Sequence, residues 1–73
     1  MDIRIKIGAR IKELRLKNKL TQEGLAYKAN MDKTYLNEVE NGKRNVSVVN
    51  LEKVIKALEV SVSAFFNNTD FKK

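Results

Sequence analysis

The chain has 73 residues, enough for one small domain, and it contains no Cys, no His and no Pro. Disulfides are therefore excluded, and the side chains that most often act as nucleophiles, acid–base catalysts and transition-metal ligands are missing. We expect no enzyme, no metal site and no cofactor. The 15 basic residues outnumber the 9 acidic ones, a net charge of +6 that favours a polyanionic partner, either nucleic acid or an anionic membrane surface.

The positive charge is concentrated in the first part of the chain. Residues 1–44 carry 11 Lys or Arg against 6 Asp or Glu, whereas residues 45–73 carry 4 against 3. No signal peptide is visible, and the longest apolar run is only a few residues, too short to cross a membrane. We expect a soluble cytoplasmic protein with no membrane partner. An ordinary solubility charge is the alternative explanation of the basic residues.

The first predicted helix covers residues 3–18. Apolar residues recur there at spacings of four, four and three, as they do on one face of a helix: Ile3, Ile7, Ile11 and Leu14. The opposite face carries charged side chains: Arg10, Lys12, Glu13 and Lys17. The spacing predicts an amphipathic helix that packs on one side against the rest of the chain.

Four helix-start signals divide the remaining chain. In each, a residue whose side-chain oxygen can accept a free backbone N–H lies between apolar residues: Thr21, Asp32, Ser47 and Ser61. They predict further helices at residues 22–29, 33–41, 48–59 and 62–68. Gly42 and Asn30 follow two of these helices, and both residue types tolerate left-handed backbone. Residues 67–73 are polar apart from Phe71, and we expect them to fray.

The predicted helices 22–29 and 33–41 are short and are joined by residues 30–32 alone, which is the geometry of a helix-turn-helix. Such a motif presents the N-terminal end of its second helix to the major groove of DNA. Side chains that can read base edges lie outside the apolar face of that helix: Lys33, Thr34, Asn37 and Glu38. Side chains that can bind backbone phosphates lie around the two helices: Thr21, Gln22, Tyr35, Asn41, Lys43 and Arg44.

Each of these residues also has a simpler explanation. Lys33 and Glu38 could be solvated charges on an exposed helix face. Tyr35 could be an aromatic residue at the edge of the core, and residues 43–44 could carry ordinary loop charge. Their combination beside a helix-turn-helix in a basic chain favours DNA binding.

Two segments of the chain resemble the Cro/C1-type (XRE) helix-turn-helix family. They are residues 20–29 (LTQEGLAYKA) and 34–42 (TYLNEVENG), and residues 45–51 with 57–66 are similar to the last two helices of that family. The resemblance covers about residues 7–66. Within the family, residues 33–35 and 44–45 most resemble the controller proteins of restriction–modification systems.

The resemblance implies a compact five-helix, all-α, lambda-repressor-like domain over residues 1–73. It also implies a homodimer that regulates transcription by binding a two-fold symmetric operator in double-stranded DNA. Carried over to this chain, it places Gln22 on a phosphate, and it assigns base reading or DNA contact to Lys33, Thr34, Glu38, Tyr35 and Arg44. It further implies an ion pair between Arg15 and Glu40. Three residues depart from the family pattern: Gly24, Asn30 and Val46. The sequence explains no role for Gly24.

The C-terminal part of the chain has more apolar residues than its two short helices need. We expect these to form a dimer interface, since exposed apolar patches usually mark contact surfaces: Val46, Val48, Val49, Val62, Phe65 and Phe66.

The chain has no room for an effector domain, so no small-molecule ligand is expected. The alternatives to a restriction–modification controller are a phage-type repressor and an antitoxin-like protein-binding module with the same fold. An RNA-binding module is disfavoured, because no cluster of stacking aromatics is present.

Overall fold

The computed structural model describes residues 2–72, and within them the secondary structure is entirely helical. The elements in chain order are α1 (Ile3–Lys17), α2 (Gln22–Lys28), α3 (Lys33–Glu40), α4 (Val48–Ala57), α5 (Val62–Phe66) and a 3₁₀ turn, η1 (Thr69–Phe71). The five predicted α-helices are confirmed, and each ends one or two residues earlier than predicted. No helix in this described range is long and apolar enough to cross a membrane.

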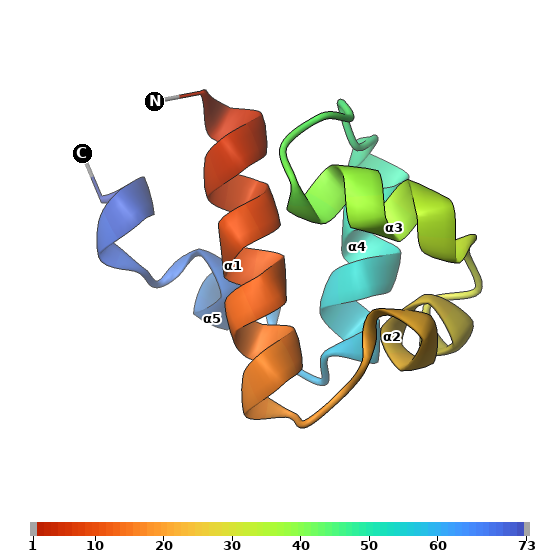
Figure 1. Ribbon diagram of the computed structural model, residues 1–73. Coiled ribbons are helices and arrows are strands. Elements are labelled where there is room, and N and C mark those ends of the chain that lie inside the picture. The colour runs from red at the N-terminus through yellow and green to blue at the C-terminus, as the bar shows by residue number, and fades with distance from the viewer. Residues whose placement is uncertain (1, 73) are drawn as a thin grey trace.

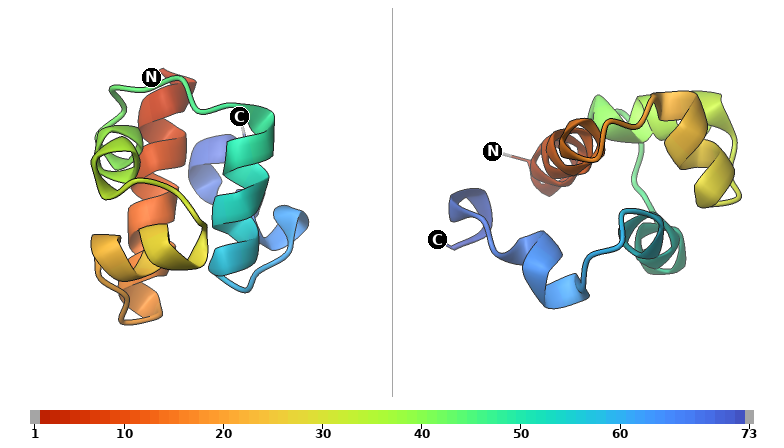
Figure 2. Two further views of the ribbon diagram at one scale, coloured as in Figure 1. Left: turned by 90° about the vertical axis from the view of Figure 1, so that its right-hand side faces the viewer. Right: turned by 90° about the horizontal axis from the view of Figure 1, so that it is seen from below.

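The helices form a small bundle around α1 and α4, whose axes run in roughly the same direction (Figure 1). The pair α2 and α3 closes one side of the space between them, and α5 with the C-terminal turn closes the other, as the view from below in Figure 2 shows. Helix α3 therefore lies at one side of the molecule and α5 at the opposite side. This separation places two different surfaces on one small domain.

The four predicted helix starts are confirmed in atomic detail. The side chain of Thr21 accepts the backbone N–H of Gly24 at 2.9 Å, and the other three caps accept equivalent N–H groups at 3.0 to 3.1 Å: Asp32, Ser47 and Ser61. A fifth cap, Asp2, begins α1 by accepting the backbone N–H of Arg4 at 2.8 Å. Hydrogen bonds from the Arg4 guanidinium, helped by that N–H, lower the pKa of the Asp2 carboxyl from 3.8 to about 2.

Left-handed residues terminate the helices that the caps begin. Gly42 and Asn30 have φ of 74° and 56°, so the two predicted left-handed positions are confirmed. Lys19 and Glu59 adopt the same conformation, with φ of 57° and 61°, although neither is Gly or Asn. At Glu59 an ion pair with Lys28, 2.9 Å from Nζ to Oε2, lowers the pKa of the carboxyl. These turns follow α1, α2, α3 and α4, each of which ends earlier than predicted.

A single hydrophobic core lies between the helices. Its members are Ile11, Leu14, Leu25, Ala26, Ala29, Leu36, Val39, Val54, Ile55, Ala57, Leu58 and Phe65. The apolar face predicted for α1 reaches this core through Ile11 and Leu14, with Ile7 partly buried, but Ile3 remains exposed. Helix α1 therefore extends one turn beyond the core.

Helix α1 meets the end of α3 at Gly8. A Cβ atom built on Gly8 would collide with the backbone carbonyl oxygens of Val39 and Glu40. Since backbone atoms cannot rotate away as a side chain can, only glycine permits this close approach. No role for Gly8 is visible in the sequence, because its partners on α3 are more than thirty residues away.

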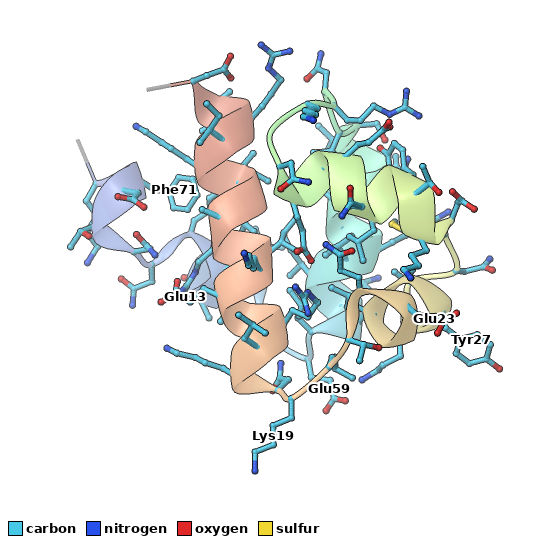
Figure 3. All side chains as sticks on the ribbon, in the orientation of Figure 1. Glu13, Lys19, Glu23, Tyr27, Glu59 and Phe71 are labelled. Atoms are coloured by element: carbon cyan, nitrogen blue, oxygen red, sulfur yellow. The ribbon has the colours of Figure 1, made fainter. Side chains whose placement is uncertain are left out.

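The C-terminal residues pack against the body, so the prediction that residues 67–73 fray is wrong for their described part. Phe71 packs edge-on against Phe66 with ring centroids 5.0 Å apart, and Asn68 donates to Glu13 at 3.3 Å. Figure 3 shows Phe71 beside α1, on the side of that helix away from α3. An aromatic side chain at the end of a polar segment supplies the contact that orders it.

Arg10 also departs from its predicted place on a solvated face. Its guanidinium donates to the carbonyls of Phe65 at 2.7 Å and Ala64 at 2.9 Å, and it pairs with Glu13 at 2.9 Å. These carbonyls lie at the C-terminal end of α5, where helices have unsatisfied acceptors. Arg10 therefore caps α5 and ties it to α1.

Candidate nucleic-acid interface

The N-terminal turn of α3 is exposed to solvent. Asp32 caps it by accepting the backbone N–H groups of Thr34 and Tyr35, and Lys33 and Thr34 are both exposed. The opposite face of α3 is buried through Leu36 and Val39. The helix is thus seated in the core while its first turn presents an ammonium, a hydroxyl and a methyl group to solvent.

A buried ion pair joins α1 to the C-terminal end of α3. Arg15 Nε lies 2.7 Å from Glu40 Oε2 and Arg15 Nη2 lies 3.1 Å from Glu40 Oε1, a bidentate arrangement. A third donor of Arg15 reaches the carbonyl of Leu20 at 2.9 Å, in the connection to α2. One guanidinium therefore holds α1, α3 and the start of α2 together.

Gln22 lies at the start of α2, where phosphate binding was predicted, and its amide is already held by α3. Its Nε2 donates to Glu40 Oε1 at 3.1 Å, and its Oε1 accepts from Asn37 Nδ2 at 3.0 Å. Asn37 in turn accepts from Asn41 Nδ2 at 3.3 Å. Three predicted DNA contacts, Gln22, Asn37 and Asn41, are thus brought into one hydrogen-bonded row.

A second cluster surrounds Arg44, after the end of α3. Its guanidinium carbon lies 5.0 Å from the centre of the Tyr35 ring, and its Nε lies 3.3 Å from Glu38 Oε1. The Tyr35 hydroxyl accepts from Asn50 Nδ2 at 3.2 Å, at the start of α4. Tyr35 is partly buried, as a core-edge aromatic would be, and its hydroxyl is held by Asn50. The arrangement brings together Tyr35, Glu38 and Arg44, which the sequence analysis placed on the DNA-facing surface.

The two remaining predicted phosphate ligands flank these clusters. Lys43 is exposed in the connection from α3 to α4. Thr21 is exposed, and its hydroxyl oxygen serves as the cap of α2 while its O–H stays available as a donor. Exposed polar and cationic groups therefore occur in the α1–α2 and α3–α4 connections as well as in the first turn of α3.

The predicted dimer residues fall into three groups. Val48, Val49 and Val62 are 84%, 64% and 53% exposed, and they line an apolar groove of about 350 Å³ between α4 and α5 together with Leu51, Glu52, Ile55 and Phe66. Val46 and Phe66 are partly buried against the core. Phe65 is completely buried, which corrects its placement in the interface. A side chain that fills the core offers no surface to a partner.

Sequence reasoning missed two polar residues of this architecture. Asn50 supports Tyr35, and Arg10 caps α5, and the sequence predicts neither role. Asn50 lies three residues after the Ser47 cap, in the first turn of α4. No sequence signal joins Arg10 to α5, because its acceptors are backbone carbonyls more than fifty residues away.

The fold and the surface of α3 define a helix-turn-helix protein of the lambda-repressor-like, Cro/C1 type. Residues 11–65 match the helix-turn-helix family. The chain is 44% identical over 70 residues to the control protein C.MunI of a Mycoplasma species, covering 94% of this chain and 95% of that protein. It is 42% identical over 60 residues to the control protein C.BamHI of Bacillus amyloliquefaciens, covering 81% and 74% of the two chains.

A solved structure shows the same likeness in three dimensions. The restriction–modification controller protein C.Esp1396I, crystallised as a tetramer with its natural 35 base-pair operator, matches with a TM-score of 0.86 and 42% identity over 90% of this chain and 87% of that one. The chain belongs to the helix-turn-helix family, among the controller proteins of restriction–modification systems. The resemblance seen in the sequence is thereby confirmed.

Proposed function

We propose that this protein is a sequence-specific transcription regulator that controls the genes of a restriction–modification system by binding operator DNA. The observation that carries the proposal is the exposed first turn of α3, held by the buried Arg15–Glu40 pair in the fold that C.Esp1396I uses on its operator. The protein acts by binding, without catalysis, in the cytoplasm and in association with the nucleoid. A single domain over residues 1–73 performs both DNA binding and self-association.

Two kinds of contact provide the binding. Lys33 and Thr34 read base edges in the major groove, where an ammonium can donate to guanine O6 and N7 and a Thr methyl can pack on a thymine methyl. Lys43, Gln22 and the backbone at the start of α2 bind phosphates, which set affinity and register without reading sequence. Deformability of the DNA between the contacts adds further specificity.

Self-association completes the DNA-binding unit. The apolar groove between α4 and α5 lies on the opposite side of the molecule from α3, so a second copy can cover it while both α3 helices remain free (Figure 2). A two-fold dimer presents two recognition helices to half-sites about 34 Å apart, one turn of DNA. Occupancy of the operator then follows protein concentration, because dimerisation and DNA binding are coupled by mass action.

Selection from a random duplex library tests this function. The full chain should enrich a two-fold symmetric motif whose half-sites are centred about one helical turn apart. The Lys33→Ala variant should lose preference at one base pair in each half-site. Enrichment of no motif, or of a single unrepeated half-site, would contradict the proposal and favour a protein-binding module.

A further inference from the structure

Three side-chain amides form a single row that ends on a buried carboxylate. The row runs from Asn41 to Asn37 at 3.3 Å, from Asn37 to Gln22 at 3.0 Å and from Gln22 to Glu40 at 3.1 Å. Glu40 is buried and is also held by Arg15, whereas Asn37 and Asn41 are exposed and Gln22 is partly buried. The row therefore connects the interior of the domain to the surface that faces DNA.

The carboxylate dictates the orientation of every amide in the row. An ionised Glu40 only accepts hydrogen bonds, so Gln22 must direct its NH₂ group inward and its oxygen toward Asn37. That oxygen needs a donor, so Asn37 turns its own NH₂ toward Gln22 and its oxygen toward Asn41. Each N–H thus donates toward the buried charge, and hydrogen bonds aligned in this way polarise and strengthen one another.

This arrangement changes what Asn37 can do. An Asn reads adenine by offering a donor and an acceptor together, but one N–H of Asn37 already donates to Gln22 and its oxygen already accepts from Asn41, so the row fixes how this amide is oriented. Gln22 likewise keeps one N–H outside the row, and it lies at the start of α2, where phosphate binding is expected. We propose that Asn37 is a positioning residue that fixes the Gln22 amide so that its remaining N–H meets a DNA phosphate. The proposal rests on DNA binding as the function, and it replaces the expectation that Asn37 reads a base.

The neutrality of these amides gives the proposal a distinctive signature. A Lys that neutralises a phosphate releases a counterion, and its loss reduces the salt dependence of binding. A neutral amide releases none, so its loss weakens binding without changing the salt slope. It also weakens binding to every sequence alike, because phosphates carry no base information.

A double-mutant cycle tests the inference. Binding of a specific and a scrambled duplex is measured across a salt series for the parent, Gln22→Ala, Asn37→Ala and the double variant. We expect Asn37→Ala to weaken both duplexes by the same factor, roughly tenfold for a dimer, with an unchanged salt slope. In the Gln22→Ala background the Asn37→Ala change should cost nothing further, since Asn37 acts through Gln22. The matched control is Asn67→Ala, an exposed Asn after α5, which should leave binding unchanged.

Two binding results would overturn the proposal. Loss of preference at one base pair on Asn37→Ala would make Asn37 a base reader, and fully additive losses in the cycle would separate Asn37 from Gln22. A parent that binds neither duplex would instead refute the proposed function. Side-chain NMR then tests the row independently, because the Gln22 NH₂ protons should exchange slowly in the parent and faster in Asn37→Ala. Equal exchange in both would show that the row does not form.

Discussion

Arg15 and Glu40 face each other across α1 and α3 in a bidentate ion pair whose side chains are only 9% and 1% exposed. The pair stands at the junction of three elements, since Arg15 also binds the Leu20 carbonyl and Glu40 also accepts from Gln22. Desolvation of both charges is thereby offset by several hydrogen bonds rather than by one contact. The orientation of the recognition helix depends on this junction.

Removing one partner of the buried pair should strongly destabilise the domain. Glu40→Ala leaves the Arg15 guanidinium buried without its carboxylate, which typically costs on the order of 3–5 kcal/mol. Glu52→Ala removes an exposed carboxylate of α4 and should change the free energy of unfolding by less than about 1 kcal/mol. Thermal or urea unfolding of both variants gives the comparison. Equal melting temperatures would mean that the pair contributes no more than a surface ion pair.

The two glycines inside helices should respond in opposite ways to alanine. Gly8→Ala forces a Cβ against two backbone carbonyls of α3 and should cost about 3 kcal/mol, at the upper end for overpacking. At Gly24 the added Cβ would lie 3.2 Å from Thr21 Oγ1 and 3.8 Å from Leu20 Cδ2, which a small shift relieves. The gain in helix propensity is about 1 kcal/mol, so Gly24→Ala should be neutral or mildly stabilising.

Urea unfolding of these two variants beside the parent measures both effects. A strongly destabilised Gly24→Ala would show that the Thr21 cap cannot give way. A Gly8→Ala variant as stable as the parent would mean that α1 and α3 separate without loss of core contacts. Each variant serves as the control for the other, since both substitutions replace a glycine within a helix by alanine.

The helix starts could be predicted from sequence because each depends on a few adjacent residues. Thr21 and Ser61 cap their helices through a backbone N–H three residues away, and that distance is visible in the sequence itself. Gly8 and Arg10 act on backbone carbonyls that only the folded chain brings near. Backbone acceptors carry no side-chain signature, so these long-range roles could not be read from residue types or spacing.

The residues of the candidate site also divide into those that local sequence predicts and those that depend on how the helices pack. Lys33 and Thr34 could be placed at the exposed start of α3 because the Asp32 cap fixes where that helix begins. The engagement of Asn37 by Gln22 could not be foreseen, because it requires the angle at which α2 meets α3. Phe65 and Phe66 are adjacent and chemically identical, yet only the packing of α5 against the rest of the domain decides that Phe65 is buried.

The carboxyl of Asp2, which caps α1, should titrate at an unusually low pH. The pKa of Asp2 is held at about 2, below its ordinary 3.8, chiefly by the Arg4 guanidinium and then by the Arg4 backbone N–H. Because the pKa is lower in the folded state, the ionised Asp2 carboxylate stabilises the fold at pH values above its ordinary pKa. This contribution disappears as the pH falls through about 2. Arg4→Ala should raise the pKa only partway toward 3.8, because the backbone N–H remains. Carboxyl NMR of Asp2 checks this, and an unchanged midpoint would assign the shift to the backbone alone.

Dimerisation should depend on the exposed valines of the groove rather than on the core. The variant with both Val49→Ser and Val62→Ser removes apolar surface from side chains that are more than half exposed in one protomer. It should therefore remain folded but sediment as a monomer at tens of micromolar, where the parent is a dimer. Leu16→Ser changes a similarly exposed apolar residue on α1 and should leave the dimer intact. A dimer that survives the double substitution would place the interface elsewhere.

Lys33 and Lys43 should separate base reading from phosphate binding. Lys33 lies in the first turn of α3, so Lys33→Ala should cost roughly 1–3 kcal/mol per half-site on the specific duplex and flatten preference at one base pair. Lys43 lies beyond Gly42 in the connection to α4. Lys43→Ala should weaken specific and scrambled duplexes equally and reduce the salt slope by about one unit per protomer, hence about two in the dimer.

Binding of both duplexes across a salt series, for Lys33→Ala and Lys43→Ala, distinguishes these roles because each variant controls for the other. The two substitutions remove the same charge from exposed positions, so a general loss of positive potential would affect them alike. If Lys33→Ala weakened both duplexes equally and lowered the salt slope, Lys33 would be a phosphate ligand and the first turn of α3 would not enter the groove. If neither substitution changed binding, the DNA surface would lie away from α3, and the polar surface around its first turn would serve a protein partner instead.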